Sequence, residues 1–98
     1  MLGFLPSSAG RCGRLKVTGN PNPDCTGEYR EAGVYDGKPY YARIVDTFKI
    51  YWKDAVHTWF ISPNLGQSAP SWISDTQKLI SRYSATVDYT GYAFVEID

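Results

Sequence analysis

The feature that most constrains the fold of this chain is the dipeptide Asp36-Gly37, which separates two runs of alternating side chains. A two-residue type I′ turn needs positive φ at both central positions, and Asp-Gly is among the pairs that supply it most readily. The flanking runs, residues 28–35 and 38–45, alternate with the period of two that is typical of strands. Residues 28–45 are therefore predicted to form an antiparallel hairpin, and one face of its first strand is expected to carry Tyr29, Glu31, Gly33 and Tyr35.

A second hairpin is predicted immediately after the first, with its turn at residues 53–56. Its two strands, residues 48–53 and 57–62, also alternate. Tyr51 is predicted to point outward, between two lysines of the same face. The opposite face is large and hydrophobic, so it is predicted to belong to the core. That face carries Phe48, Ile50, Trp52, Trp59 and Ile61.

The rest of the chain also favours strands. Aromatic residues make up 15% of the sequence and occur among β-branched residues and glycines, a composition typical of sheets. Further strands are predicted over residues 15–18, 71–73, 83–89 and 92–97, while Ser74 or Asp75 could cap a short helical turn. The predicted fold is an all-β antiparallel meander of six to seven short strands that closes into a small barrel or sandwich, with at most one short helix near residues 75–81.

The chain of 98 residues fits a single domain. Residues 1–14 have no periodicity and are predicted to form an irregular arm, followed by one β domain over residues 15–98. The apolar start at residues 1–5 is too short for a signal peptide, and no run is long enough to span a bilayer. We therefore expect a soluble protein without a membrane partner, cytoplasmic by default unless a leader precedes this sequence.

Charge and cysteine content exclude several classes of function. Ten basic residues balance ten acidic ones and no run of one sign occurs, whereas a nucleic-acid-binding protein is expected to carry a basic patch. Cys12 and Cys25 are too far apart for a CxxC site, so we interpret them as two separate thiols. In an oxidising compartment they would instead form one bridge. No nucleic-acid partner, metal or other cofactor is expected.

Residues 26–66 contain a recurring pattern of turn glycines and aromatic residues. It consists of Thr26-Gly27-Glu28-Tyr29, Gly33, Gly37-Lys38-Pro39-Tyr40-Tyr41, Ile50-Tyr51-Trp52, Trp59-Phe60-Ile61-Ser62 and Leu65-Gly66. This pattern resembles a hairpin-rich module that occurs, sometimes repeated, in microbial and phage-associated proteins. The resemblance covers about two fifths of the chain and becomes weaker from Pro70 onward. It implies the strand register described above, but that module has no assigned catalytic residues to transfer.

Aromatic rings outside the core are the best candidates for a functional site. Tyr and Trp combine a large contact area with a polar tip, which is typical of binding surfaces. We therefore predict a small non-catalytic binding module with a protein or carbohydrate ligand. The residues predicted to contact the ligand are Tyr35, Tyr40, Tyr41, Tyr51 and Trp72. The alternative is that these rings simply form the core of a small β domain.

Two other classes of function remain open at this point. Exposed rings could form the interface of a self-assembling homodimer. A small enzyme could use His57, the only histidine, together with a carboxylate such as Asp46, Asp54 or Asp88. The sequence gives no reason to place an acid beside His57, and no basic neighbour activates the thiol of Cys25.

Overall fold

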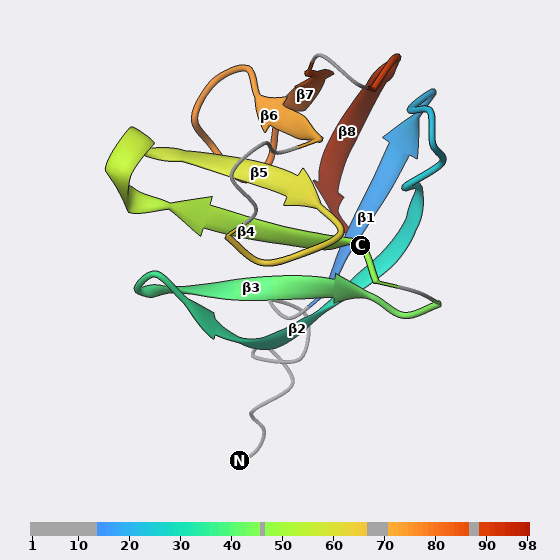
Figure 1. Cartoon of the computed structure of the whole chain (residues 1–98). Coiled ribbons are helices and arrows are strands. Elements are labelled where there is room, and N and C mark those ends of the chain that lie inside the picture. Colours follow the sequence, from blue (N-terminus) through green and yellow to red (C-terminus); the bar gives the residue numbers. More distant parts are fainter. Residues whose placement is uncertain (1–13, 46, 67–70, 87–88) are drawn as a thin grey trace.

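The computed structural model describes residues 14–45, 47–66, 71–86 and 89–98, which form a closed barrel of antiparallel strands (Figure 1). The strands follow one another around the barrel in sequence order. They are β1 (Arg14–Gly19), β2 (Gly27–Tyr35), β3 (Lys38–Arg43), β4 (Lys49–Lys53), β5 (Thr58–Ser62), β6 (Trp72–Ser74), β7 (Arg82–Ala85) and β8 (Tyr92–Ile97). The all-β prediction is confirmed, with one strand more than expected. The predicted N-terminal arm lies outside the described residues except for Arg14, which already belongs to β1.

Closure of the barrel depends on β1, which pairs with β2 on one side and with β8 on the other. Val17 is the partner of Gly27 in β2 and of Val95 in β8. Each described strand therefore has two neighbours, and no strand edge among them is left open. Closure removes the unpaired backbone groups through which strands of separate molecules aggregate.

The first hairpin forms as the sequence predicts, but its faces change part-way along β2. Asp36 and Gly37 have φ values of 52° and 89°, as the turn requires. A β-bulge shifts the register between Glu31 and Gly33. A shift of one residue exchanges the two faces of a strand. Gly33 and Tyr35 therefore lie on the outer face, and the prediction that they share the face of Tyr29 was wrong.

The core fills the inside of the barrel with large aromatic and aliphatic side chains. Ile50, Trp59 and Ile61 belong to it, and Phe48 and Trp52 pack against it, which confirms the face predicted for the second hairpin. The buried cluster comprises Leu15, Val17, Cys25, Tyr29, Tyr41, Ile50, Trp59, Ile61, Trp72, Tyr83, Ala93 and Val95. Aromatic rings bury 150–250 Å² each, so a few of them supply much of the hydrophobic stabilisation that a domain of this size needs.

The two ends of the barrel differ. One end is covered by the connection between β1 and β2, because Tyr29 donates a hydrogen bond of 2.7 Å to the carbonyl of Cys25. In the same connection, Arg43 Nη1 donates to the carbonyl of Asp24 at 2.8 Å. The opposite end carries the turns of the β2–β3 and β4–β5 hairpins, which lie at the left of Figure 1.

The β4–β5 turn is a single 3-10 turn, Asp54–Val56, followed by His57 in the left-handed region with φ of 51°. The amide of His57 donates to the carbonyl of Asp54 at 3.3 Å and closes this turn. It is the one helical element of the described chain.

The connection between β6 and β7 is an irregular loop where the sequence allowed a short helix. Ser74 Oγ donates to the carbonyl of Lys78 at 2.7 Å and accepts from the amide of Thr76 at 3.4 Å. Gln77 adopts a positive φ of 66°, which a right-handed helix excludes.

β7 ends at Ala85, earlier than predicted, and residues 87–88 lie outside the described chain. No helix in the described ranges has the length and hydropathy needed to cross a membrane.

Candidate functional site

The five aromatic residues predicted to contact a ligand do not share one exposed surface. Trp72 and Tyr51 are fully buried, and Tyr41 is 7% exposed. Trp72 and Tyr41 point into the barrel and belong to its core. Tyr35 and Tyr40 are half-buried on the outer face, so they alone among the five keep access to solvent.

Trp72 lies in a wall strand of the barrel, β6, and its side chain belongs to the enclosed core. Its ring centroid lies 6.0 Å from that of Phe48 and 5.1 Å from that of Tyr89. The sequence could not assign its face, since β6 has three residues and too short an alternation to interpret. A role for Trp72 in packing therefore replaces contact with a ligand.

Tyr51 points outward, as its place in the alternation indicates, but other side chains cover it. Its ring makes edge-to-face contacts with the rings of Tyr35 and Phe60, at centroid distances of 5.5 Å and 5.8 Å. Its hydroxyl lies 3.3 Å from Ser62 Oγ and donates a hydrogen bond to it. A side chain at Gly66 would overlap the Tyr35 hydroxyl, so the segment after β5 folds back against these rings. A small second core therefore occupies the outer face of β4 and β5.

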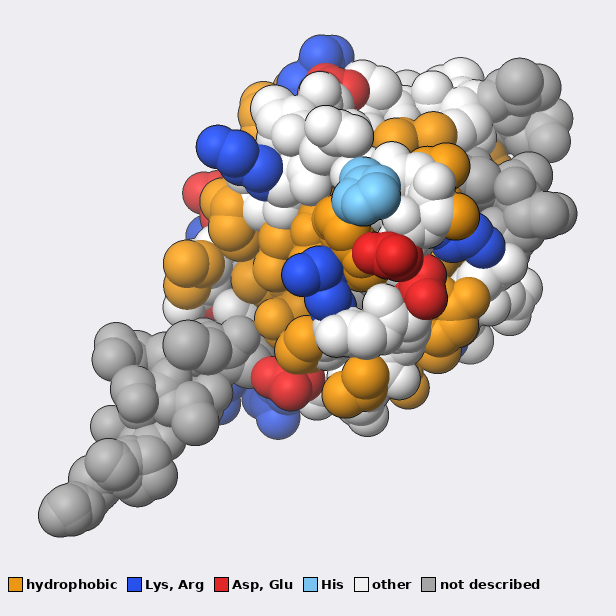
Figure 2. Space-filling model, turned by 90° about the vertical axis from the view of Figure 1, so that its left-hand side faces the viewer, with side chains coloured by type: hydrophobic (Ala, Val, Ile, Leu, Met, Phe, Trp, Pro, Cys, Tyr) orange, Lys and Arg blue, Asp and Glu red, His pale blue; other side chains and the backbone are white. Residues whose placement is uncertain are grey.

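A surface that combines exposed apolar groups with polar ones lies at the tips of the two hairpins. A hydrogen bond of 2.8 Å from the amide of Asp54 to Asp36 Oδ2 joins the two turns. Val34 is 72% exposed at the end of β2, and Val56 is 52% exposed in the β4–β5 turn. We define the hairpin-tip surface as Val34, Asp36, Lys38, Trp52, Asp54, Val56 and His57. Figure 2 looks onto this side of the barrel and shows hydrophobic side chains gathered among acidic, basic and histidine side chains.

Trp52 is the central ring of the hairpin-tip surface. It is half-buried and packs edge-on against the rings of Trp59 and His57, at centroid distances of 5.6 Å and 6.0 Å. Its indole Nε1 donates to Asp54 Oδ1 at 3.3 Å. The Nζ atom of Lys38 lies over the ring, 4.9 Å from its centroid. Trp52 therefore anchors the two turns and places charged groups of both signs around a partly exposed ring.

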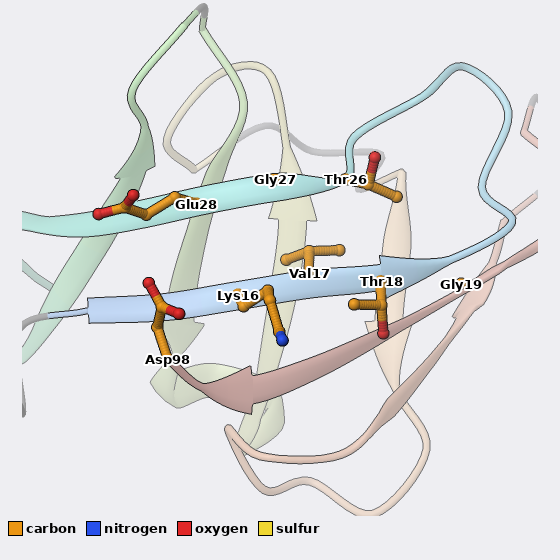
Figure 3. Close-up of a pocket in the computed structure, with 8 residues that line it drawn as sticks. All are labelled: Lys16, Val17, Thr18, Gly19, Thr26, Gly27, Glu28 and Asp98. Atoms are coloured by element: carbon orange, nitrogen blue, oxygen red, sulfur yellow. The ribbon is translucent and has the colours of Figure 1, made fainter.

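A shallow groove of about 540 Å³ lies on the outer face of β1 and β2 (Figure 3). Its polar side chains come from three strands or their ends: Lys16 and Thr18 from β1, Thr26 and Glu28 from the start of β2, and Asp98 after β8. The groove is open to solvent, and Glu28 is already paired with Arg30 at 3.0 Å. Phe94 is 40% exposed and is the cross-strand partner of Thr18, so a ring borders the groove.

The side chains that could carry out catalysis are not assembled for it. His57 is exposed and contacts Trp52, and no ion pair joins it to a carboxylate within the described residues. Cys25 is a free, buried thiol, and burial raises its pKa to about 12, so the nucleophilic thiolate is scarce at neutral pH. The described chain holds no cluster of three or more potential metal ligands. Cys12, Asp46 and Asp88 lie outside it.

Comparison with known proteins yields no match: the chain matches no family model, no curated protein and no solved structure. Functional assignment therefore depends on the geometry described above.

The sequence analysis did not predict the hairpin-tip surface because it assigned residues 36–37 and 53–56 only to turns. Val34 lies two residues before Asp36, and Val56 ends the second turn. An exposed aliphatic residue in or beside a tight turn is a signal that could have indicated this surface. Trp52 was assigned only to the core, and its contact with Lys38 required the three-dimensional arrangement.

Proposed function

We propose that this protein is a non-catalytic binding module that docks a partner protein on its hairpin-tip surface. The observation that carries the proposal is that Val34 and Val56 are exposed at two turns joined by the hydrogen bond from Asp54 to Asp36. The partly exposed ring of Trp52 contacts residues of the same two turns, Lys38 and Asp54. Contiguous exposed apolar groups with a polar rim mark sites of interaction between proteins. Trp is also among the residues that contribute most to binding energy at such interfaces.

The chemistry of this surface favours a protein over a carbohydrate. A sugar presents hydroxyl groups around a small apolar face, so its sites need a free ring face with polar groups beside it. Here the ring of Trp52 carries a cation, Lys38, which a neutral sugar cannot replace, and the exposed groups of the same two turns include the aliphatic side chains of Val34 and Val56. Side chains of a protein partner match such groups better.

A matched pair of substitutions tests this proposal. Val34 and Val45 are both 72% exposed, but Val45 lies in the β3–β4 connection at the opposite end of the barrel. Peptides selected from a display library on the wild-type protein are measured against Val34→Asp and Val45→Asp. We expect affinity to fall roughly tenfold or more with Val34→Asp, as at an interface hot spot, and to stay unchanged with Val45→Asp. Peptides that bind Val34→Asp as tightly as the wild type would contradict the proposal.

The same variants decide whether the partner is a second copy of this chain. Light scattering coupled to size-exclusion chromatography measures the mass of the wild type and of Val34→Asp. A dimer that Val34→Asp converts to a monomer would identify self-assembly as the role of the hairpin-tip surface. A monomer in both cases supports docking of a different protein.

The groove on the outer face of β1 and β2 carries a second candidate function, binding of a carbohydrate. The observation that favours it is the exposed ring of Phe94 beside a groove lined by hydroxyl, ammonium and carboxylate groups. A sugar ring could stack on Phe94 while its hydroxyls bond to Thr26 and Lys16. Glycan-array binding that is lost in Phe94→Ala and kept in Val34→Asp would support this function. Binding that is equal in both variants would exclude the groove as the sugar site.

A further inference from the structure

A positively charged group already lies over the ring of Trp52. The ammonium group of Lys38 lies 4.9 Å from its centroid, within the range of a cation–π interaction. The indole N–H points away to Asp54 Oδ1 at 3.3 Å. A carboxylate that accepts from the indole increases the electron density of the ring, and this strengthens its attraction for a cation.

Two carboxylates lie in the turns around this ring, and among the described residues each keeps one oxygen that accepts no hydrogen bond. Asp54 Oδ1 accepts from Trp52, and Asp36 Oδ2 accepts from the amide of Asp54. Within the described ranges, no ion pair links Lys38 to either carboxylate. Lys53, the next residue along β4, points to the opposite face from Trp52. Lys38 therefore contacts the ring, and within the described residues the two carboxylates have no cationic partner.

A guanidinium group fits these surroundings better than the ammonium of Lys38 does. It is planar and stacks on an aromatic ring, and its forked donors can bond to a carboxylate at the same time. It is also more weakly hydrated than an ammonium, so it loses less on leaving water. Lys38 is exposed, and an exposed cation–π contact is weak enough to be exchanged.

We propose that the face of Trp52 is a binding site for an arginine side chain of the partner, and that Lys38 occupies this site until the partner arrives. The inference rests on the proposed docking at the hairpin-tip surface. The partner segment then combines an apolar contact to Val34 with a guanidinium that stacks on Trp52 and bonds to Asp36 or Asp54. Lys38 acts as an internal competitor that lowers the apparent affinity for this arginine.

The first test uses N-acetyl-arginine amide and its neutral analogue N-acetyl-citrulline amide. Both are titrated into ¹⁵N-labelled protein, and the indole N–H resonance of Trp52, assigned by its loss in Trp52→Phe, is followed. We expect a saturable shift with the arginine compound and none with the citrulline compound. Lys38→Gln should tighten arginine binding roughly two- to fivefold, the range of one exposed cation–π contact. Equal responses to the two compounds, or no tightening in Lys38→Gln, would overturn the inference.

The second test separates this inference from the proposed function. Library-selected peptides that require Val34 are resynthesised with citrulline in place of arginine. A loss of affinity on this exchange, together with tighter binding of the arginine form to Lys38→Gln, supports the arginine site. Peptides that require Val34 but tolerate citrulline overturn the arginine site and leave docking intact. Peptides that ignore Val34 overturn the docking itself.

Discussion

Trp72→Ala gives the sharpest test of the barrel interior. The indole is fully buried and packs against Phe48 and Tyr89. Burying 150–250 Å² of ring at about 25 cal/mol per Å² corresponds to about 4–6 kcal/mol. Substitutions of buried Trp by Ala typically cost about 3–5 kcal/mol. Since domains of this size are stable by about 5–15 kcal/mol, the variant is expected to lose a large fraction of its free energy of unfolding.

Trp72→Phe is the matched control for this substitution. It keeps a ring between Phe48 and Tyr89 but removes the indole Nε1, which is buried without a hydrogen-bond partner among the described residues. Because an unpartnered buried donor costs about 1–3 kcal/mol, its removal offsets part of the lost packing. We expect Trp72→Phe to lose at most about half as much stability as Trp72→Ala. Urea unfolding followed by circular dichroism measures both, and a cost below about 1 kcal/mol for Trp72→Ala would refute the interior placement.

Two further predictions concern pH and backbone strain. Burial raises the pKa of Cys25 to about 12, so above about pH 9 the unfolded chain releases a proton that the folded chain keeps. The free energy of unfolding should therefore fall as the pH rises from about 9 to about 12, by up to about 1.4 kcal/mol per pH unit. Urea titrations at several pH values measure this slope, and Cys25→Ala should flatten it. Identical slopes in the wild type and Cys25→Ala would refute the prediction. Gly37 and Gly91 both have positive φ, but only at Gly91 would an added Cβ overlap the carbonyl of Asn20. Gly37→Ala should thus cost about 1 kcal/mol and Gly91→Ala clearly more, and equal losses in thermal melts would contradict this.

Local chemistry explains why much of the fold could be predicted from the sequence. Asp36-Gly37 fixes its turn through the φ values of two residues, and the core face of the second hairpin follows from the alternation through Ile50 and Trp52. These signals act over a few residues, so no distant contact is needed to interpret them.

Features set by distant contacts could not be predicted. Pairing of β1 with β8 joins residues such as Val17 and Val95, whose register depends on every strand between them. The bulge at Ala32 exchanges the faces of β2 and leaves no mark in the pattern of side chains. Tyr51 points outward as expected, yet it is buried because Tyr35 and Phe60 pack against it.

The aromatic residues predicted from the sequence to contact a ligand are not those of the proposed hairpin-tip surface, whose central ring is Trp52 with Lys38 and Asp54 around it. The particular residues differ because exposure depends on where each turn lies on the barrel. Val34 is exposed since it stands at a hairpin tip, beyond the enclosed interior.

The central claim is that ligands contact the hairpin tips, and chemical-shift mapping tests it most directly. A library-selected peptide is titrated into ¹⁵N-labelled protein, and perturbed amides are placed on the barrel. The account predicts that the shifts concentrate at residues 34–38 and 52–57 and include the indole N–H of Trp52. Shifts that concentrate instead along the groove, at residues 16–18 and 26–28, would contradict it.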